Sequence, residues 1–199
     1  MNEAKSLIVL VHGVCANRIV MWPFACLLRA QGFRVRQWTY SSLFYPVAFH
    51  AARFSEFLNA IQGTETRFHI VAHSMGAIVV RSALLRCEHR KLGRLVFLAP
   101  PNRGSPIARM ASNIFGHVFP PVLELSDTET SFVNQLASCT DLEIGTVAAR
   151  FDFFVPPKNT HLANQKSHVI LNATHNSLLY SAKASKLAAN FLNNGSFSF

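Results

Sequence analysis

The sequence predicts an α/β fold, with a mostly parallel β-sheet of about six strands and helices on both faces. Two patterns support this prediction. Short apolar runs rich in β-branched residues, such as residues 7–11, are typical of strands buried on both faces. Segments with helical periodicity separate these runs. The 199 residues, half of them hydrophobic, suit one domain spanning residues 1–199.

Strands and helices alternate in the order that such a sheet requires. We predict strands at residues 7–11, 33–40, 68–72, 95–98, 144–151 and 168–172. Helices are expected at residues 22–28, 46–63, 75–87 and 184–191. Pro23 suits a first helical turn, Gly32 the end of that helix, and Ser181 an N-cap. Residues 104–140 break the alternation, which indicates a small lid-like insertion over one edge of the sheet, above the active site.

The chain is basic, with 19 Lys and Arg against 10 Asp and Glu, a net charge of +9. This balance favours anionic partners in general. Nucleic-acid binding is not expected, because no zinc-finger spacing, RNA-binding aromatic motif or basic arm accompanies the charge. The basic residues are expected either to be solvated or to make transient contact with an anionic membrane surface. No obligate protein partner is expected.

Three further features of the sequence indicate where the protein is located and what its cysteines do. No apolar run reaches the roughly 20 residues of a membrane-spanning helix. The N-terminus enters a strand without the layout of a signal peptide, so we expect a cytoplasmic protein, with a mature secreted form as the alternative. The spacing of the cysteines fits neither a metal site nor a redox pair, so we expect reduced, buried thiols at Cys15, Cys26, Cys87 and Cys139.

The segment His73-Ser74-Met75-Gly76 joins a predicted strand to a predicted helix. So abrupt a turn strains its middle residue, and small neighbours let the strand and the helix approach closely. Ala72 and Gly76 stand at the two glycine positions of the G-x-S-x-G motif. We therefore predict that Ser74 is a nucleophile above the carboxyl ends of the strands. The alternative is an ordinary helix start capped by Ser74.

An acyl-transfer site also needs two backbone N–H groups that bind the developing oxyanion. One would come from Met75, which follows the predicted nucleophile. The other would come from the loop after the first strand, where Val14 follows the flexible Gly13. In the same loop, His12 is interpreted as a hydrogen-bond donor that orders the backbone.

A carboxylate must hold the base that activates such a serine. The aspartates are Asp127, Asp141 and Asp152. Asp152 directly follows a predicted strand, so it lies at the same edge of the sheet as Ser74. Asp127 and Asp141 fall in or beside the insertion, and Asp127 resembles a helix cap. Asp152 is therefore the predicted acid.

The base is expected among nine histidines. His175 follows the last predicted strand, which again places it at the carboxyl edge. The order Ser74, Asp152, His175 is that of α/β-hydrolases. His161 and His168 come before the end of that strand, and His73 is interpreted as structural.

Several motifs occur together in a specific order. They are Val11-His12-Gly13-Val14, Ala72-His73-Ser74-Met75-Gly76, Pro100-Pro101-Asn102-Arg103-Gly104-Ser105, Asp152 with Val155-Pro156, and Thr174-His175-Asn176-Ser177-Leu178-Leu179. In this combination the chain resembles small bacterial lipases and esterases of the α/β-hydrolase superfamily, and it is most similar to the minimal Bacillus-type lipases. The insertion departs from that pattern.

The resemblance implies a carboxylic-ester hydrolase with Ser74, Asp152 and His175 as triad and with Val14 and Met75 as oxyanion hole. Neither a metal nor an organic cofactor is expected. The insertion is too short for a large hinged lid. Ile107, Met110 and Phe119 are expected to line a shallow acyl cleft for short- to medium-chain esters, with little interfacial activation. The alternatives are an acyltransferase with the same triad and a non-catalytic binding protein on this scaffold.

Overall fold

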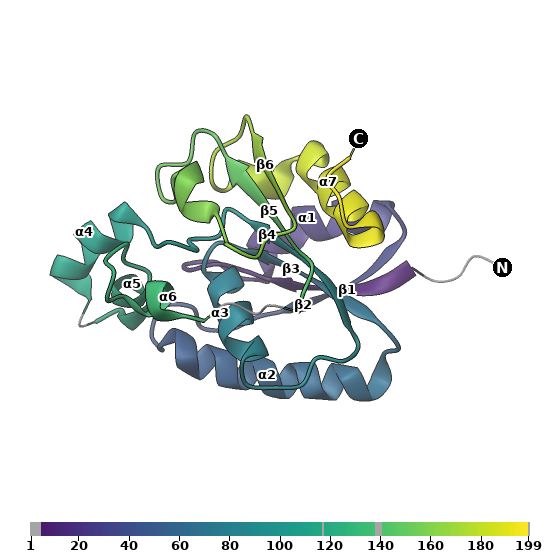
Figure 1. The fold of residues 1–199 in the computed structure, drawn as a ribbon, viewed down its shortest axis with the longest axis horizontal. Coiled ribbons are helices and arrows are strands. Elements are labelled where there is room, and N and C mark those ends of the chain that lie inside the picture. The colour runs from purple at the N-terminus through teal and green to yellow at the C-terminus, as the bar shows by residue number, and fades with distance from the viewer. Residues whose placement is uncertain (1–4, 117, 138–140, 199) are drawn as a thin grey trace.

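A computed structural model describes residues 5–116, 118–137 and 141–198. Its centre is a parallel six-stranded sheet in the order β2-β1-β3-β4-β5-β6 (Figure 1). The predicted α/β class is confirmed. The strands are β1 (Lys5–Val11), β2 (Phe33–Trp38), β3 (Phe68–His73), β4 (Leu92–Leu98), β5 (Ile144–Ala149) and β6 (Ser167–Leu171).

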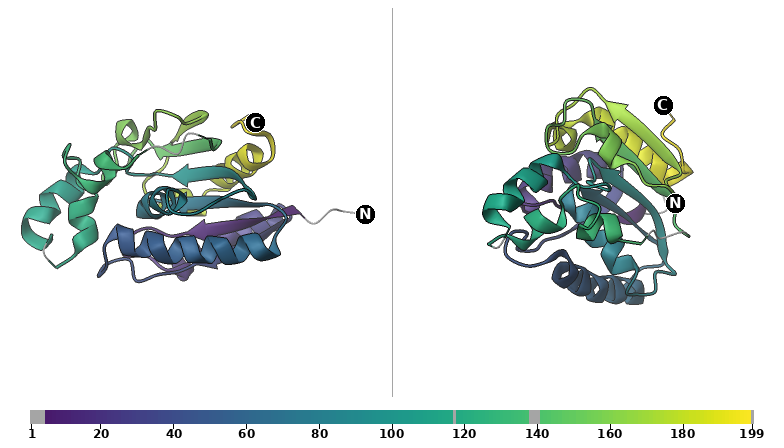
Figure 2. Two further views of the ribbon diagram at one scale, coloured as in Figure 1. Left: turned by 60° about the horizontal axis from the view of Figure 1, so that its bottom comes forward. Right: turned by 60° about the vertical axis from the view of Figure 1, so that its left-hand side comes forward.

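The helices form two layers around this sheet, and a third group lies beyond the strand ends. Figure 2 shows α2 and α7 on opposite sides of the sheet and α4 and α5 past its carboxyl end. The helical elements are α1 (Arg18–Ala30), α2 (Val47–Thr64), α3 (Met75–Leu84), α4 (Pro106–Phe115), α5 (Pro120–Glu124), α6 (Phe132–Gln135), η1 (Pro157–Thr160), η2 (Ser177–Tyr180) and α7 (Ala182–Asn194).

Buried apolar side chains fill both sides of the sheet. Val9 and Ile70 point into the layer under α2 and α3, where Phe54 is fully buried. Ile8 and Val71 point into the layer under α1 and α7. Alternate residues of one strand face opposite sides of a sheet, so strands that are covered on both faces, such as β1 and β3, are apolar at most positions. This requirement explains the continuous hydrophobic runs in the sequence.

Two predicted helix boundaries are wrong. Helix α1 begins at Arg18, where the Asn17 side chain accepts the N–H of Ile19, so Pro23 lies inside the helix rather than in its first turn. Helix α3 ends at Leu84 and not at Cys87. The N-cap predicted for the last helix is confirmed, since Ser181 accepts the N–H of Ala184 at 3.1 Å.

The cysteines are less buried than predicted. Cys15 is exposed and Cys26 and Cys87 are half-buried, while Cys139 lies outside the described residues. The expectation of buried thiols is therefore wrong for Cys15, because it lies in the open loop after β1. Within the described ranges, no helix is both long and apolar enough to cross a membrane.

The start of α3 lies against the end of β1. A Cβ atom on Gly76 would come within 2.5 Å of the His12 carbonyl oxygen and 2.7 Å of the Val11 carbonyl oxygen. A residue other than glycine would therefore push the helix away from the strand. Gly63 in α2 has no atom within 4 Å of the same added carbon.

We predict that Gly76→Ala lowers the free energy of unfolding by about 1–3 kcal/mol, because the backbone must shift to accept the methyl group. Gly63→Ala is the matched control and raises that free energy by about 0.5–1 kcal/mol, the usual gain for alanine over glycine in a helix. Urea unfolding of both variants measures the difference. Equal stability of Gly76→Ala and the wild type would contradict the close approach.

Candidate active site

Ser74 lies in a strained turn between β3 and α3. Its φ is +53° and its ψ −128°, a conformation that residues with side chains rarely adopt and that costs on the order of 1–3 kcal/mol. The Ser74 N–H donates to the Leu98 carbonyl at 2.9 Å, which ties the turn to the end of β4. The turn presents Ser74 at the carboxyl edge of the sheet, as the sequence predicts for a nucleophile elbow.

Asp152 and His175 come from the two loops that follow β5 and β6. The Nδ1 atom of His175 donates to Oδ2 of Asp152 at 2.6 Å, and both residues are buried. The other carboxylate oxygen, Oδ1, accepts the backbone N–H groups of Phe154 and Val155, each at 2.9 Å. These two bonds fix the orientation of the carboxylate, and the carboxylate in turn fixes the imidazole ring.

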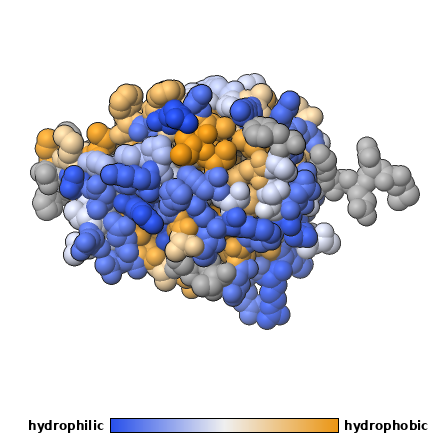
Figure 3. All heavy atoms as spheres, turned by 45° about the horizontal axis from the view of Figure 1, so that its top comes forward, coloured by the Kyte–Doolittle hydropathy of each residue, from blue (hydrophilic) through white to orange (hydrophobic). Residues whose placement is uncertain are grey.

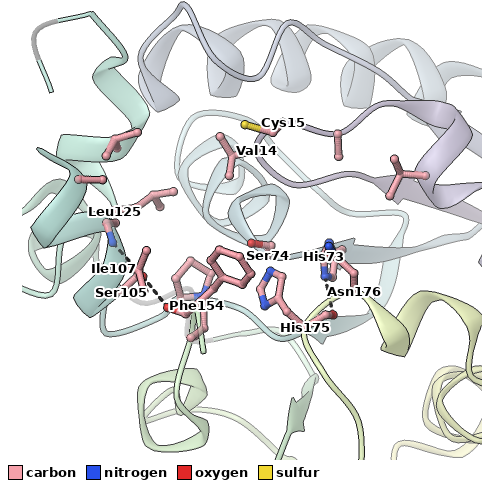
Figure 4. A pocket seen from close by; sticks show the side chains of 17 residues that line it. Val14, Cys15, His73, Ser74, Ser105, Ile107, Leu125, Phe154, His175 and Asn176 are labelled. Carbon is pink, nitrogen blue, oxygen red and sulfur yellow. Dashed lines mark hydrogen bonds between the residues drawn. The ribbon is translucent and has the colours of Figure 1, made fainter. Parts of the chain in front are cut away.

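A cavity of about 460 Å³ opens above Ser74, between the strand ends and helices α4 and α5. Figure 4 shows Ser74 and His175 next to each other on its wall. Most of its other lining side chains are apolar, among them Val14, Val20 and Leu125. The structure thus brings the three residues predicted as a triad to one apolar cavity, with Asp152 behind His175.

The loop after β1 approaches the serine closely. A Cβ atom on Gly13 would lie 2.8 Å from Cβ of Ser74, so only glycine fits there. The neighbouring His12 orders the loop, since its Nδ1 bonds the Gly13 carbonyl at 2.9 Å while Tyr40 Oη donates to the His12 carbonyl at 2.8 Å. Burial lowers the pKa of His12, which keeps the ring neutral. Val14 then lines the cavity, whereas Met75 is fully buried at the start of α3.

His73, next to the serine, is buried beside His175. Its Nε2 lies 3.2 Å from the His175 carbonyl oxygen, and the two ring centroids are 4.7 Å apart. Burial, with the nearby His175, lowers the pKa of His73 to about 3. The neutral ring can donate through Nε2 and so hold the backbone of His175. The sequence did not reveal this contact, because it joins residues a hundred positions apart in the chain.

The residues predicted to line the acyl cleft divide between two environments. Ile107 lines the cavity together with Ala108 and Ala111 of the same helix. Met110 does not line it, because it lies on the other side of α4 and is 65% exposed. Phe119 does not line it either and packs against Phe44, with ring centroids 6.0 Å apart. Among the lining residues that the sequence did not predict are Cys15, Ser105, Phe154 and Asn176.

Hydrogen bonds attach the insertion to the rest of the site. Ser105 caps α4 and donates its hydroxyl to the Phe154 carbonyl at 2.5 Å, which joins the insertion to the loop that carries Asp152. Just before the insertion, buried Asn102 donates to the Thr160 carbonyl at 2.7 Å and accepts from Arg81 at 3.2 Å. The Ser105 bond therefore holds one side of the cavity wall, and the Asn102 bonds order the segment that leads into it.

Asp127 does not cap a helix as predicted, because α6 begins only after Ser131. It forms an ion pair with Arg109 at 3.1 Å. Within the described ranges, no group of three or more His, Cys, Asp or Glu side chains is arranged to hold a metal ion.

This fold and this strained serine turn define the class of the protein. Residues 8–184 match the sequence model of the alpha/beta hydrolase family, and the chain belongs to that family. No curated protein matches the sequence significantly. Among solved structures, the mature form of Bacillus licheniformis lipase BlEst2 has a TM-score of 0.74 and 18% identity, covering 98% of this chain and 94% of that one. Aspergillus fumigatus lipase B has a TM-score of 0.79 and 18% identity, covering 96% of this chain and 53% of that one.

We predict that His73 makes the protein sensitive to acid. In the unfolded chain its pKa returns to about 6.5, so below that pH the unfolded state binds one more proton than the native state. The free energy of unfolding should therefore fall by about 1.4 kcal/mol per pH unit from this residue alone between pH 6 and 4. His73→Gln, which retains a donor, should remove this part of the slope in urea unfolding.

Part of the acid sensitivity should remain in that variant, because burial also lowers the pKa of His69 to about 4. His89→Gln, at the opposite end of the sheet, is the control and should keep the wild-type slope. A His73→Gln variant with an unchanged slope would contradict the buried, neutral state of His73.

Proposed function

We propose that the protein is a serine carboxylic-ester hydrolase and that Ser74, Asp152 and His175 form its catalytic triad. The observation that carries this proposal is the 2.6 Å bond between His175 and Asp152 at an apolar cavity whose wall also holds a strained serine. A carboxylate on Nδ1 leaves Nε2 of His175 available to accept a proton. Membership of the alpha/beta hydrolase family is consistent with this chemistry.

In the first half of the reaction, Ser74 Oγ attacks the ester carbonyl while His175 takes its proton. Asp152 holds the imidazole in the required tautomer and stabilises the imidazolium that forms. His175 then gives the proton to the departing alcohol, and the acyl group stays on Ser74. In the second half, His175 takes a proton from the water that attacks the acyl-enzyme, and it returns this proton to Ser74 Oγ as the acid leaves.

The oxyanion of each tetrahedral intermediate would bind the backbone N–H groups of Val14 and Met75. Two features support this assignment. Met75 is the first residue of α3, and the first N–H groups of a helix have no partner within it. Gly13 brings the loop of Val14 against Ser74. Such preorganised donors are worth a factor of about 10²–10³ each in related sites.

The substrate would be a small-molecule ester or lipid with a short to medium acyl chain. A cavity of about 460 Å³ lies within the usual range for small ligands, and its walls suit an alkyl group. Ile107 and Ala111 of α4 would border the acyl chain. The proposed steps use only protein groups and water.

We predict that Ser74→Ala and His175→Ala each lower kcat for an ester substrate by about 10⁶, and that the double variant is little worse than either one, because the residues act as a unit. Hydrolysis of p-nitrophenyl butyrate by the purified proteins measures the effect. Asp152→Asn should be clearly impaired, whereas Asp141→Asn, at an exposed position, is the matched control and should be active. Normal turnover by folded Ser74→Ala would refute the assignment.

We predict that acyl chains of short to medium length are hydrolysed best and that α4 sets this limit. Ala111→Phe should lower kcat/KM for p-nitrophenyl octanoate several-fold more than for the acetate, because the added ring occupies the cavity. Met110→Phe places the same ring on the exposed side of α4. It should leave the ratio of kcat/KM for the octanoate to kcat/KM for the acetate unchanged. A series of p-nitrophenyl esters below their solubility limits provides the measurement. Equal ratios in both variants would contradict this placement of the acyl chain.

A further inference from the structure

Exposed apolar side chains gather at the end of the molecule where the cavity opens. Large hydrophobic side chains project from the starts of α1 and α2, from the insertion, and from the loop after β5, all at the carboxyl edge of the sheet. We call six of them the rim surface, namely Ile19, Phe44, Met110, Ile114, Phe151 and Phe153, each at least 56% exposed.

Two members of the rim surface lie next to residues of the cavity wall. Ile19 adjoins the lining residue Val20, and Phe153 adjoins the lining residue Phe154. Figure 3 shows hydrophobic atoms at the surface at the left-hand end, where Figure 1 places α4, with hydrophilic atoms beside them. So many exposed large side chains at one end are unusual for a surface that faces only water. A partner that covers Ile19 and Phe153 therefore lies close to the cavity.

Cations border the same end of the molecule. Arg18, Arg103, Arg150 and Lys158 are exposed, and none makes an ion pair within the part of the chain that the structure describes. Their segments belong to the loops and helix starts at the carboxyl edge.

Most of the acids of these segments already have a hydrogen-bond or ion-pair partner, and Glu129 of the insertion is exposed. Asp152 bonds His175, Asp127 pairs with Arg109, and Glu124 accepts the N–H of Val47 at 2.7 Å. The rim therefore combines projecting apolar groups with an excess of positive charge.

We infer that the rim surface docks on an anionic lipid membrane, with its apolar side chains inserted among the acyl chains and its cations against the headgroups. Separate loops that each project one or two large side chains match the interfacial layer of a bilayer better than the flat core of a protein interface. The positive charge matches anionic headgroups. Docking in this orientation opens the cavity toward the lipid. The inference goes beyond ester hydrolysis and holds whether or not Ser74 is a nucleophile.

Vesicle sedimentation of the full chain tests the docking. We expect the protein to bind vesicles of equal parts phosphatidylcholine and phosphatidylglycerol at least tenfold more tightly than vesicles of phosphatidylcholine alone. Ile114→Ser with Phe153→Ser should weaken binding to the anionic vesicles about tenfold or more, because two inserted side chains are lost. Arg18→Glu with Lys158→Glu should weaken it to a similar extent.

Leu85→Ser with Arg86→Glu is the matched control. These neighbours are also exposed, but they lie where α3 ends, at the opposite end of the sheet, and the variant should bind as the wild type does. Circular dichroism establishes that all variants are folded. Absence of vesicle binding, or equal loss in the control and the rim variants, would overturn the inference. So would a rim-dependent dimer in solution that binds no vesicles, since the rim would then be an interface between two copies.

Discussion

The contact between the end of β1 and the start of α3 is the constraint on which the rest of the site depends. Gly76 lets the helix backbone reach the carbonyls of Val11 and His12, and Gly13 lets the following loop reach Ser74. These two close approaches hold the strained serine and the backbone of the β1 loop on one side of the cavity. Burial of the two apolar layers of the sheet supplies the stability that offsets the strain of the turn at Ser74.

A second set of contacts makes the opposite side of the cavity rigid. Asp152 is oriented by backbone N–H groups of its own loop, and it orients His175. The same loop accepts the hydroxyl of Ser105, which begins α4. The insertion, the acid and the base are therefore linked, so a change in the insertion is expected to reach the base through this loop. Met110, Ile114 and Phe153 of the rim surface belong to these linked elements.

The sequence predicts the fold class and the order of strands and helices along the chain, because both depend on local patterns. Continuous apolar runs mark strands that are buried on both faces, and the position of Asp152 and His175 after such strands places them at the same edge of the sheet as Ser74. Properties that depend on tertiary packing are harder to predict from the sequence. A helical repeat groups Ile107 with Met110, but only the angle at which α4 meets the sheet decides that Ala111 faces the cavity and Met110 faces solvent. The contact between His73 and His175 likewise depends on loops that are distant in sequence.

The central claim is that Ser74 is the reactive nucleophile of this cavity, and covalent labelling tests it most directly. The folded protein would be treated with a fluorophosphonate, digested, and analysed by peptide mass spectrometry. One phosphonyl group is expected on the peptide that contains Ser74, with none on the unfolded protein or on the double variant Asp152→Asn, His175→Ala. Labelling of another serine, such as Ser105 on the same cavity wall, or no labelling of an active preparation, would contradict it.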